Sequence, residues 1–585
     1  MAGRCRGADV IAEGLQALGV STVFCYPGGA NLEILDALSG VDIRLIRTEH
    51  EQGAVFAAQG YARATGRLGV CLATSGPGAT NLVTGIADAN SDSVPVLAIT
   101  GNVATRWLGR NAFQEVDIVA VVRPITRHAE QVRSAADIGT ALARASDVAL
   151  AGRRGPVLLD FPKDVQQATL PAMPAFPAQA LHSPHAAEGA AAAGIPAGDM
   201  ATLRELLAEA RRPVIYAGGG VIASGTGDLL VRLAEGLNCP ATLTLMGLGA
   251  MPAAHPLMLG PLGMHGAQVA NVAVNEADLV LALGVRFDDR VIGDPEAFAR
   301  PARIVHIDVD ASEIGKNRAV FMGIRADLRQ ALPQLLDIAE PIDTLQWREY
   351  LRGVDVGRPL RAGSDGDVLS GTAAVACLAG RLPPDCVVAT GVGQHQMWAM
   401  QHCRVTGPRG FLSSSGFGTM GFGLPAAIGA KIARPDATVV DIDGDGSLNM
   451  VINELSTCHR NGIGVKVFVV NNQWLGMVRQ WQDMIYTGNR VVSASDDALF
   501  DVGGEAGAPY PDFLAIARGY GVRAERVATP AALPAAIDRM LADPDEPWLL
   551  DVIVEREEDV FPMIPAGRGY RDVIFARGEG SVSDS

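Results

Sequence analysis

The feature that most constrains the fold is a GDG segment at residues 444–446, followed 27 residues after its aspartate by Asn472. The preceding residues 437–443 (ATVVDID) and the later residues 465–470 (VKVFVV) are short apolar runs rich in β-branched side chains, as in buried strands. Between them, apolar residues from 448 to 458 recur at the spacing of a helix. This order of strand, helix and strand predicts a βαβ unit with parallel strands.

Both loops of the predicted unit carry oxygen atoms suited to Mg²⁺. Asp445 and Asn472 each follow a predicted strand, and the carboxyl ends of neighbouring parallel strands meet at the edge where open α/β sheets bind ligands. Magnesium prefers hard oxygen ligands. The pattern resembles the GDG…NN signature of thiamine-diphosphate enzymes, and the resemblance implies that Asp445, Asn472 and the main-chain carbonyl of Trp474 bind Mg²⁺. The alternative is an ordinary strand-turn-helix with a glycine-rich turn.

The composition is that of a large globular enzyme. A chain of 585 residues predicts three or four domains of roughly 150–200 residues each. Hydrophobic residues make up 48% and charged residues 19%, which argues against a disordered chain. A net charge of −16 without a Lys/Arg run argues against nucleic acid as a partner, and the apolar runs are too short to span a membrane. Eight scattered cysteines and a start without a signal-like leader predict a cytoplasmic protein.

Helix-like and strand-like segments alternate along most of the chain, which predicts an α/β fold. We expect three consecutive parallel-sheet α/β domains of the thiamine-diphosphate enzyme type, at residues 1–170, 199–345 and 369–560. The stretch 170–198 is rich in Pro and Ala and lacks periodicity, so it is a predicted linker. A second connector is predicted at 346–368.

A thiamine enzyme also needs a carboxyl group at a strand end in another domain. That carboxyl binds N1′ of the cofactor's pyrimidine, so that the cofactor's own 4′-imino group can take the proton from C2. Residues 43–48 (IRLIRT) form a candidate strand, and the resemblance assigns the role to Glu51, the glutamate directly after His50. Glu49 is an internal competitor. The ordinary explanation of Glu51 is a first-turn acid that the helix dipole stabilises.

One glycine pattern has two interpretations. Residues 416–421 (GFGTMG) match the GxGxxG form of dinucleotide-binding loops, but SSS precedes them where a strand would be required. In thiamine enzymes this segment contacts the pyrimidine and supports the bent cofactor. The resemblance places these contacts at Gly418 and Met420, and we favour this interpretation.

Ten segments make the resemblance specific. Over residues 8–575 the chain resembles the catalytic subunit of acetohydroxyacid synthase, also called acetolactate synthase, and several segments differ from those of pyruvate decarboxylases and oxidases. The segments are YPGGA (26–30), HEQGAVFAAQGYAR (50–63), ATSGPGATNLVTGIAD (73–88), AFQEVDIV (112–119), GPVLLDFPKDV (155–165), LGMHG (262–266), RFDDRV (286–291), GVGQHQMW (391–398), GTMGFGLPAAIGA (418–430) and GMVRQWQ (476–482).

The resemblance also implies how substrates are bound. Gly28 and Gly29 would let the main chain approach the reacting centre, because glycine lacks a Cβ. Arg290 would pair with a substrate carboxylate, and Trp481 would form the wall that favours 2-ketobutyrate over pyruvate as second substrate. The other substrate-binding residues would be Phe113, Met264 and Met477, and the catalytic group would be Glu51, Gln114, Lys163 and Met420.

Two organic cofactors follow from the same resemblance. Besides Glu51, the residues implied for thiamine diphosphate are Val392, Gln394, His395, Gly418, Met420, Gly444, Asp445, Gly446, Ser447 and Asn472. The residues implied for FAD are Arg153, Gly218, Gly219, Gly220, Met264, His265, Gly284, Arg286, Asp288, Arg290, Asp308 and Asp327. The net reaction needs no redox step, so the flavin would be non-redox.

The expected function is that of an acetolactate synthase. Such an enzyme decarboxylates pyruvate and adds the two-carbon unit to pyruvate or 2-ketobutyrate, giving precursors of branched-chain amino acids. The cofactor would lie between residues 1–170 of one chain and 369–560 of another, so we expect a homodimer or homotetramer, with a possible regulatory small subunit. The alternatives are another thiamine-diphosphate carboligase or decarboxylase in a specialised pathway, and an inactive partner protein, against which Glu51, Asp445 and Asn472 argue.

Overall fold

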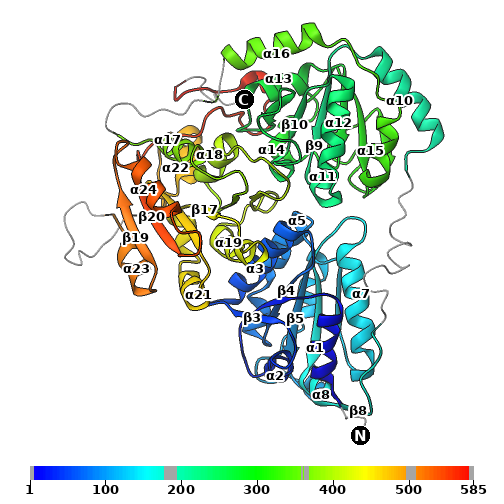
Figure 1. The fold of residues 1–585 in the computed structure, drawn as a ribbon, viewed down its shortest axis with the longest axis vertical. Coiled ribbons are helices and arrows are strands. Elements are labelled where there is room, and N and C mark those ends of the chain that lie inside the picture. The colour runs from blue at the N-terminus through cyan, green and yellow to red at the C-terminus, as the bar shows by residue number, and fades with distance from the viewer. Residues whose placement is uncertain (1–4, 177–193, 358–359, 361–367, 496–508, 579–585) are drawn as a thin grey trace.

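The structure, a computed structural model, describes residues 5–176, 194–357, 360, 368–495 and 509–578. These residues form three six-stranded sheets in which all neighbouring strands are parallel, each flanked by helices (Figure 1). The predicted fold class, three consecutive parallel-sheet α/β domains, is confirmed. No helix in the described part of the chain is long and apolar enough to cross a membrane. Of the predicted linker 170–198, residues 177–193 lie outside the described residues.

The N-terminal sheet has the strand order β3-β2-β4-β5-β7-β6. Its strands are β2 (Thr22–Cys25), β3 (Arg44–Arg47), β4 (Gly69–Ala73), β5 (Val96–Asn102), β6 (His128–Gln131) and β7 (Val157–Pro162), and β1 (Cys5–Arg6) pairs with β8 (Thr169–Leu170) as a separate antiparallel ribbon. The helices are α1 (Gly7–Ala17), α2 (Leu32–Leu38), α3 (Glu51–Thr65), α4 (Pro77–Thr80), α5 (Val83–Ser91), α6 (Ile118–Val122), α7 (Ile138–Leu150) and α8 (Lys163–Gln167), with 3₁₀ turns η1 (Thr105–Trp107), η2 (Arg123–Ile125) and η3 (Ala135–Asp137). Alternate residues of its central strands enter two different apolar clusters, so both faces are buried, as in other parallel sheets.

The central sheet has the strand order β11-β10-β9-β12-β13-β14. Its strands are β9 (Pro213–Ala217), β10 (Ala241–Leu243), β11 (Met258–Pro261), β12 (Leu279–Leu283), β13 (Arg303–Asp308) and β14 (Met322–Arg325). Its helices are α10 (Ala197–Glu209), α11 (Gly219–Ser224), α12 (Gly227–Leu237), α13 (Gln268–Glu276), α14 (Asp289–Ile292), α15 (Leu328–Leu336) and α16 (Leu345–Gly357), with a 3₁₀ turn η4 (Leu245–Gly247).

The predicted connector at 346–368 is wrong over its first part, because α16 occupies it. Trp347 and Leu351 are four residues apart on this helix and are buried in an apolar cluster with residues of α13. The indole N–H of Trp347 also donates to the carbonyl of Pro213 at 3.3 Å. Helix α16 therefore still belongs to the central domain, and the chain continues to the C-terminal domain only after it.

The C-terminal sheet has the strand order β16-β15-β17-β18-β20-β19. Its strands are β15 (Val387–Thr390), β16 (Phe411–Leu412), β17 (Val439–Gly444), β18 (Val465–Asn471), β19 (Arg523–Val527) and β20 (Trp548–Ile553). Its helices are α17 (Gly371–Ala379), α18 (Gln394–His402), α19 (Gly423–Ala433), α20 (Asp445–Asn449), α21 (Glu454–Asn461), α22 (Gly476–Ile485), α23 (Phe513–Gly519) and α24 (Leu533–Leu541), and a 3₁₀ turn η5 (Tyr570–Asp572) follows near the end of the chain.

The predicted βαβ unit is confirmed in its strands, β17 and β18, but its crossover contains two helices rather than one. The short helix α20 ends at Asn449, and α21 begins at Glu454. Between them, three successive main-chain hydrogen bonds join residues three apart, starting with Glu454 N–H to Val451 C=O at 2.9 Å. This tighter 3₁₀-type winding breaks the α-helical path.

Helices α3 and α19 hold the N-terminal and C-terminal domains of the chain together (Figure 1). They pack with unusually close backbones, because a Cβ at Gly60 would overlap Ala426 C=O and a Cβ at Gly429 would overlap Ala57 C=O. Since α3 begins at Glu51, this packing helps to fix the position of that glutamate relative to the C-terminal sheet.

Candidate cofactor and active site

The first group of candidate residues, which we call the metal half-site, comprises Asp445, Asn472, Gln394, His395 and Ser447. The register of the sheet pairs Gly444 with Val470 across β17 and β18, so Asp445 and Asn472 follow the two strands at the same edge. Gln394 opens α18, just after the neighbouring strand β15. The structure therefore brings the predicted metal ligands and diphosphate residues together.

Asp445 is buried at the start of α20, and its Oδ2 has no hydrogen-bond partner among the described residues. Burial raises the pKa of Asp445 to about 7, although hydrogen bonds from Ser495 and from the main-chain N–H groups of Asp445 and Gly446 oppose this shift. A cation beside the carboxylate would stabilise its charged form. The unsatisfied oxygen thus fits a metal ligand, and Ser495 is a contact that the sequence did not indicate.

Asn472 is held by hydrogen bonds at both ends of its amide. Its Oδ1 accepts from the main-chain N–H of Trp474 at 3.0 Å, and its Nδ2 donates to Oε1 of Gln394 at 3.1 Å. In contrast, Asn471 donates to the buried carboxylate of Asp551 at 2.9 Å. The second asparagine is therefore the one whose side-chain oxygen lies toward the turn at Trp474.

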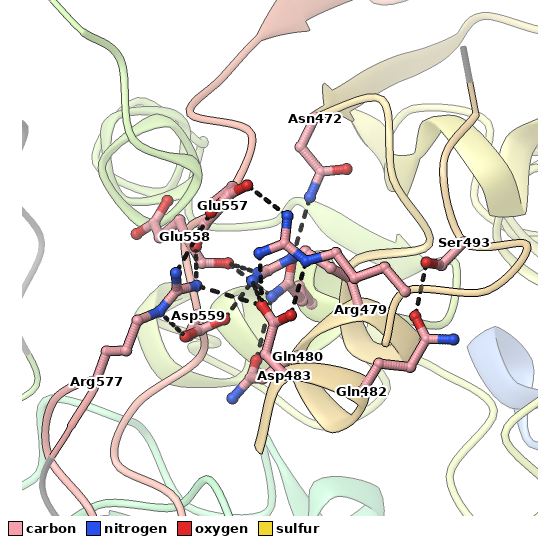
Figure 2. Close-up of polar contacts among 12 residues, drawn as sticks. Asn472, Arg479, Gln480, Gln482, Asp483, Ser493, Glu557, Glu558, Asp559 and Arg577 are labelled. Atoms are coloured by element: carbon pink, nitrogen blue, oxygen red, sulfur yellow. Dashed lines mark hydrogen bonds and ion pairs between the residues drawn. The ribbon is translucent and has the colours of Figure 1, made fainter. Parts of the chain in front are cut away.

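The Asn472 amide belongs to a longer buried relay, part of which Figure 2 shows. Gln394 Nε2 donates to Oε1 of Gln480 on α22 at 3.1 Å and to the carbonyl of Glu558 at 2.8 Å. Gln480 Oε1 also accepts from Val560 N–H at 2.9 Å. The metal half-site is thus tied to α22 and to the segment that follows β20.

The remaining residues of the metal half-site surround the GDG turn. Ser447 Oγ accepts from Gly421 N–H at 3.0 Å, and a Cβ at Gly446 would lie 3.7 Å from Met420 Cε. A Cβ at Gly444 would come within 2.6 Å of the His395 ring, so only glycine fits beneath it. Burial lowers the pKa of His395 to about 3, so this imidazole is neutral at pH 7. Val392 donates its N–H to Ser447 Oγ at 3.4 Å.

The second group, the carboxylate half-site, lies at the carboxyl edge of the N-terminal sheet and centres on Glu51. This carboxylate is buried, and its Oε2 accepts from Asn81 Nδ2 at 2.9 Å. A Cβ at Gly78 would lie 3.0 Å from Oε1. Glu49 has different surroundings: its carboxylate binds Arg47 at 3.2 Å and Arg460 at 2.7 Å.

Gly28, Gly29, Gln114 and Lys163 lie at the same sheet edge. Lys163 Nζ donates to the carbonyl of Gly29 at 3.1 Å, and a Cβ at Gly28 would lie 2.5 Å from Thr74 Cβ. Gln114 has a φ of 59°, and it lies against the loop that carries Gly76 and Gly78. Phe113 is 87% exposed to solvent.

Helix α22 carries Met477 and Trp481 one turn apart, and both are half-buried. The fully buried guanidinium of Arg479 anchors this helix, with ion pairs to Asp483 at 2.9 Å and Asp559 at 2.7 Å (Figure 2). Arg290 is mostly exposed; the carbonyl of its main chain accepts from the N–H of Met264 at 2.8 Å.

A cavity of about 220 Å³ lies where the three domains meet. Of the residues predicted to bind FAD, it is lined by Arg153, Gly219, Gly220, Gly284, Arg286, Asp288, Asp308 and Asp327. Gly218, Met264, His265 and Arg290 lie outside this lining. Arg153 spans the domains, with an ion pair to Glu313 at 2.6 Å. Burial raises the pKa of Asp308 to about 6.

Comparison with known proteins identifies the family. The thiamine pyrophosphate enzyme N-terminal TPP binding domain matches residues 5–121, the central domain 200–335, and the C-terminal TPP binding domain 391–552. An acetolactate synthase of Zea mays is 47% identical, over 97% of this chain and 89% of the maize protein. The chain belongs to the acetolactate synthase family. Its predicted family and enzyme class are confirmed.

Other acetolactate synthases give the same result across nearly the full length. Acetolactate synthase 1 of Nicotiana tabacum is 46% identical over 99% of this chain and 86% of its own length. Acetolactate synthase of Arabidopsis thaliana is 45% identical over 99% of this chain and 85% of its own length. All three plant proteins are chloroplastic by their names.

Proposed function

We propose that the protein is a thiamine-diphosphate-dependent acetolactate synthase that decarboxylates pyruvate and transfers the two-carbon unit to pyruvate or 2-ketobutyrate. The observation that carries the proposal is the metal half-site, where Asp445 and Asn472 end neighbouring parallel strands of a chain from this family. The products would be 2-acetolactate and 2-aceto-2-hydroxybutyrate, in branched-chain amino acid biosynthesis.

Asp445, Asn472 and the main-chain carbonyl of Trp474 would hold Mg²⁺. Support comes from the unsatisfied, buried Oδ2 of Asp445 and from the fixed orientation of the Asn472 amide. The N–H-rich turn at the start of α20 would receive the diphosphate. When bound, thiamine diphosphate supplies the nucleophilic carbon and then the electron sink that a 2-ketoacid decarboxylation needs.

Glu51 would hold a proton shared with N1′ of the pyrimidine. Its support is its environment, because it is buried and its one described donor is the neutral amide of Asn81, whereas Glu49 is occupied by two arginines. Met420, beside Gly446, would support the bend of the cofactor. Gln114 and Lys163 would orient the reacting ketoacid, because both lie at the carboxylate half-site.

Two copies of the chain would complete each active site. No hydrogen bond or ion pair among the described residues joins Glu51 to Asp445 or Asn472. Large apolar side chains near both half-sites are exposed in the single chain, namely Phe113 (87%), Phe417 (53%) and Met450 (62%). A partner copy that placed its carboxylate half-site over this chain's metal half-site would bury them. The homodimer is therefore the smallest unit that we propose to be active.

FAD would occupy the cavity between the three domains as a non-redox cofactor. Its support is the lining, which has glycine turns after β9 and β12 together with the side chains of Arg153 and Arg286. Met264 and Arg290, outside that lining, would instead serve the second substrate with Met477 and Trp481. A cytoplasmic location, a tetramer and a regulatory small subunit stay predictions.

The test is an assay with pyruvate plus 2-ketobutyrate in which thiamine diphosphate, Mg²⁺ and FAD are each omitted in turn. We expect both acetohydroxyacids, no turnover without thiamine diphosphate or Mg²⁺, and purified protein that is yellow from flavin. Product identification separates this function from that of another carboligase, which would give other ligation products from pyruvate alone. Free acetaldehyde as the main product would contradict the proposal.

A further inference from the structure

Glu454 is a buried carboxylate that the reaction described above does not use. It opens α21 and is fully inaccessible to solvent. Its oxygens accept from the main-chain N–H of Glu49 at 3.1 Å, from that of His50 at 3.2 Å, and from Thr457 Oγ1 at 2.6 Å. Glu49 and His50 belong to the N-terminal domain, 405 and 404 residues away in sequence.

These hydrogen bonds hold the residues directly before Glu51. His50 is the N-cap of α3 and Glu51 is its first residue, so Glu454 fixes the main chain at the entry to that helix. The positive end of the α3 dipole also favours a carboxylate there. The lack of a side chain at Gly53 lets the Glu454 carboxylate come this close to the start of α3, because a Cβ at this position would overlap Glu454 Oε1.

The charged groups near Glu454 do not neutralise it. Arg47 and Arg460 both bind the Glu49 carboxylate instead, and no ion pair to Glu454 occurs within the described ranges. A buried carboxylate without a cation is costly, and main-chain N–H groups can offset that cost only if they stay in place. An apolar residue would avoid the desolvation cost but would leave the N–H groups of Glu49 and His50 unpaired.

We propose that Glu454 is a positioning residue that sets the location of the Glu51 carboxylate by holding the main chain of Glu49 and His50 on the C-terminal domain. This inference rests on the role of Glu51 in the proposed function. Glu454 lies nine residues after Asp445, so the same crossover carries both a proposed metal ligand and the anchor of Glu51.

A purely structural role would give a different result. If Glu454 only joined two domains, its loss would lower stability and leave the reactivity of bound cofactor unchanged. If it positions Glu51, its loss would slow proton loss from C2 of thiamine diphosphate, because misplacement of about 1 Å can cost about 10²-fold. Binding of Mg²⁺ and diphosphate would change little, since those contacts come from the metal half-site.

The test variant is Glu454→Leu, which roughly keeps the size of the side chain but removes both oxygens that accept from the main-chain N–H groups of Glu49 and His50. C2–H exchange of bound thiamine diphosphate is measured in D₂O by quenched-flow NMR, on the holoenzyme. Amide hydrogen exchange of residues 49–53 is measured by mass spectrometry. We expect C2 exchange to slow by about 10- to 10²-fold, faster amide exchange at 49–53, and cofactor affinity within about threefold of wild type.

Two further variants keep the outcome clear. Asp278→Leu is the matched control, since Asp278 also accepts from two main-chain N–H groups, those of Arg211 and Arg212, at 2.8 and 2.9 Å; it should leave C2 exchange unchanged. If Glu454→Leu does not fold, Gly53→Ala displaces the Glu454 carboxylate while retaining its charge, and should slow C2 exchange in the same way.

The possible results separate the two proposals. Glu51→Gln is measured in parallel; if it leaves C2 exchange at the wild-type rate, the role of Glu51 in the proposed function is wrong. If Glu51→Gln slows exchange but Glu454→Leu, or Gly53→Ala in its place, does not, Glu454 is not a positioning residue. Slower exchange in both Glu51→Gln and the positioning variant, with cofactor binding retained, supports the inference.

Discussion

The side-chain amides of Asn472 and Gln394 face each other, with Asn472 Nδ2 donating to Gln394 Oε1 at 3.1 Å. This pair decides which end of the Asn472 amide is available, because an amide that donates through its nitrogen presents its oxygen on the other side. Gln394 is in turn fixed by Gln480 and by the carbonyl of Glu558. The orientation of a candidate metal ligand therefore depends on residues far from it in sequence.

The first prediction concerns Gln480. Gln480→Leu removes the acceptor for Gln394 and lets the Asn472 amide rotate, so Mg²⁺ affinity should fall by about 10- to 100-fold, as for other groups that orient metal ligands. Titration of Mn²⁺ in place of Mg²⁺, followed by electron paramagnetic resonance with thiamine diphosphate present, measures this directly. Gln482→Leu is the control, since Gln482 lies two residues further on and its side chain bonds to Val491 and Ser493 rather than to the relay. Equal Mn²⁺ affinity in both variants would show that the relay does not orient the ligand.

The second prediction is that Asp445→Ala weakens Mg²⁺ and thiamine diphosphate together. Among the proposed protein ligands, Asp445 would be the only charged one, and the metal would also bind the diphosphate. Isothermal titration of thiamine diphosphate at saturating Mg²⁺ should show a large loss of affinity. Asp443→Asn, on the strand β17 that leads to Asp445, tests whether any buried acid there has this effect. Unchanged affinity in Asp445→Ala would place the metal elsewhere.

The third prediction concerns Glu51→Gln. An amide cannot share a proton with N1′ as a carboxyl group does, so turnover should fall by about 10²–10⁴-fold. Asn81 can still donate to the amide oxygen, so the fold should persist, which circular dichroism and the melting temperature would confirm. Glu49→Gln should cost far less turnover, because that carboxylate binds Arg47 and Arg460. The reverse order of effects would make Glu49 the active carboxyl.

The local patterns in the sequence were sufficient to predict the strands β17 and β18 and the placement of Asp445 and Asn472 at one sheet edge. They did not indicate Asn81, Gln480, Glu454 or Ser495. These residues act through partners that lie far away in the chain, as with Glu454 and Glu49, 405 residues apart, and spacing within a motif carries no information about such contacts. Helix α16 was missed for another reason: only Trp347 and Leu351 of this helix are buried, so its apolar pattern is short.

The fourth prediction is a pH dependence of stability that involves Glu454. Burial raises the pKa of Glu454 from 4.5 to about 7, so between these pH values the folded protein holds a proton that the unfolded chain has released. Stability from this group is therefore greatest below about pH 4.5 and falls as pH rises to 7, by roughly 3 kcal/mol at most. Urea unfolding of wild type and Glu454→Gln from pH 5 to pH 8 measures the difference. The variant should lose less stability across this range, and parallel curves would show that Glu454 titrates normally.

The fifth prediction concerns the choice of second substrate at Trp481. Its indole ring lies on α22 one turn beyond Met477, and the buried ion pairs of Arg479 keep this helix in place. Trp481→Leu should therefore preserve the fold while it removes a flat apolar wall. One methylene group of contact is worth about 1–3 kcal/mol, so the preference for 2-ketobutyrate over pyruvate should fall by roughly that amount. Condensation of two pyruvates should change much less, because the methyl group of pyruvate does not reach as far.

Competition at a fixed ratio of the two ketoacids, with both products quantified, gives the preference directly. Tyr486→Leu serves as the control, since this aromatic residue follows the end of the same helix and is 62% exposed. An unchanged product ratio in Trp481→Leu would remove Trp481 from the second-substrate site.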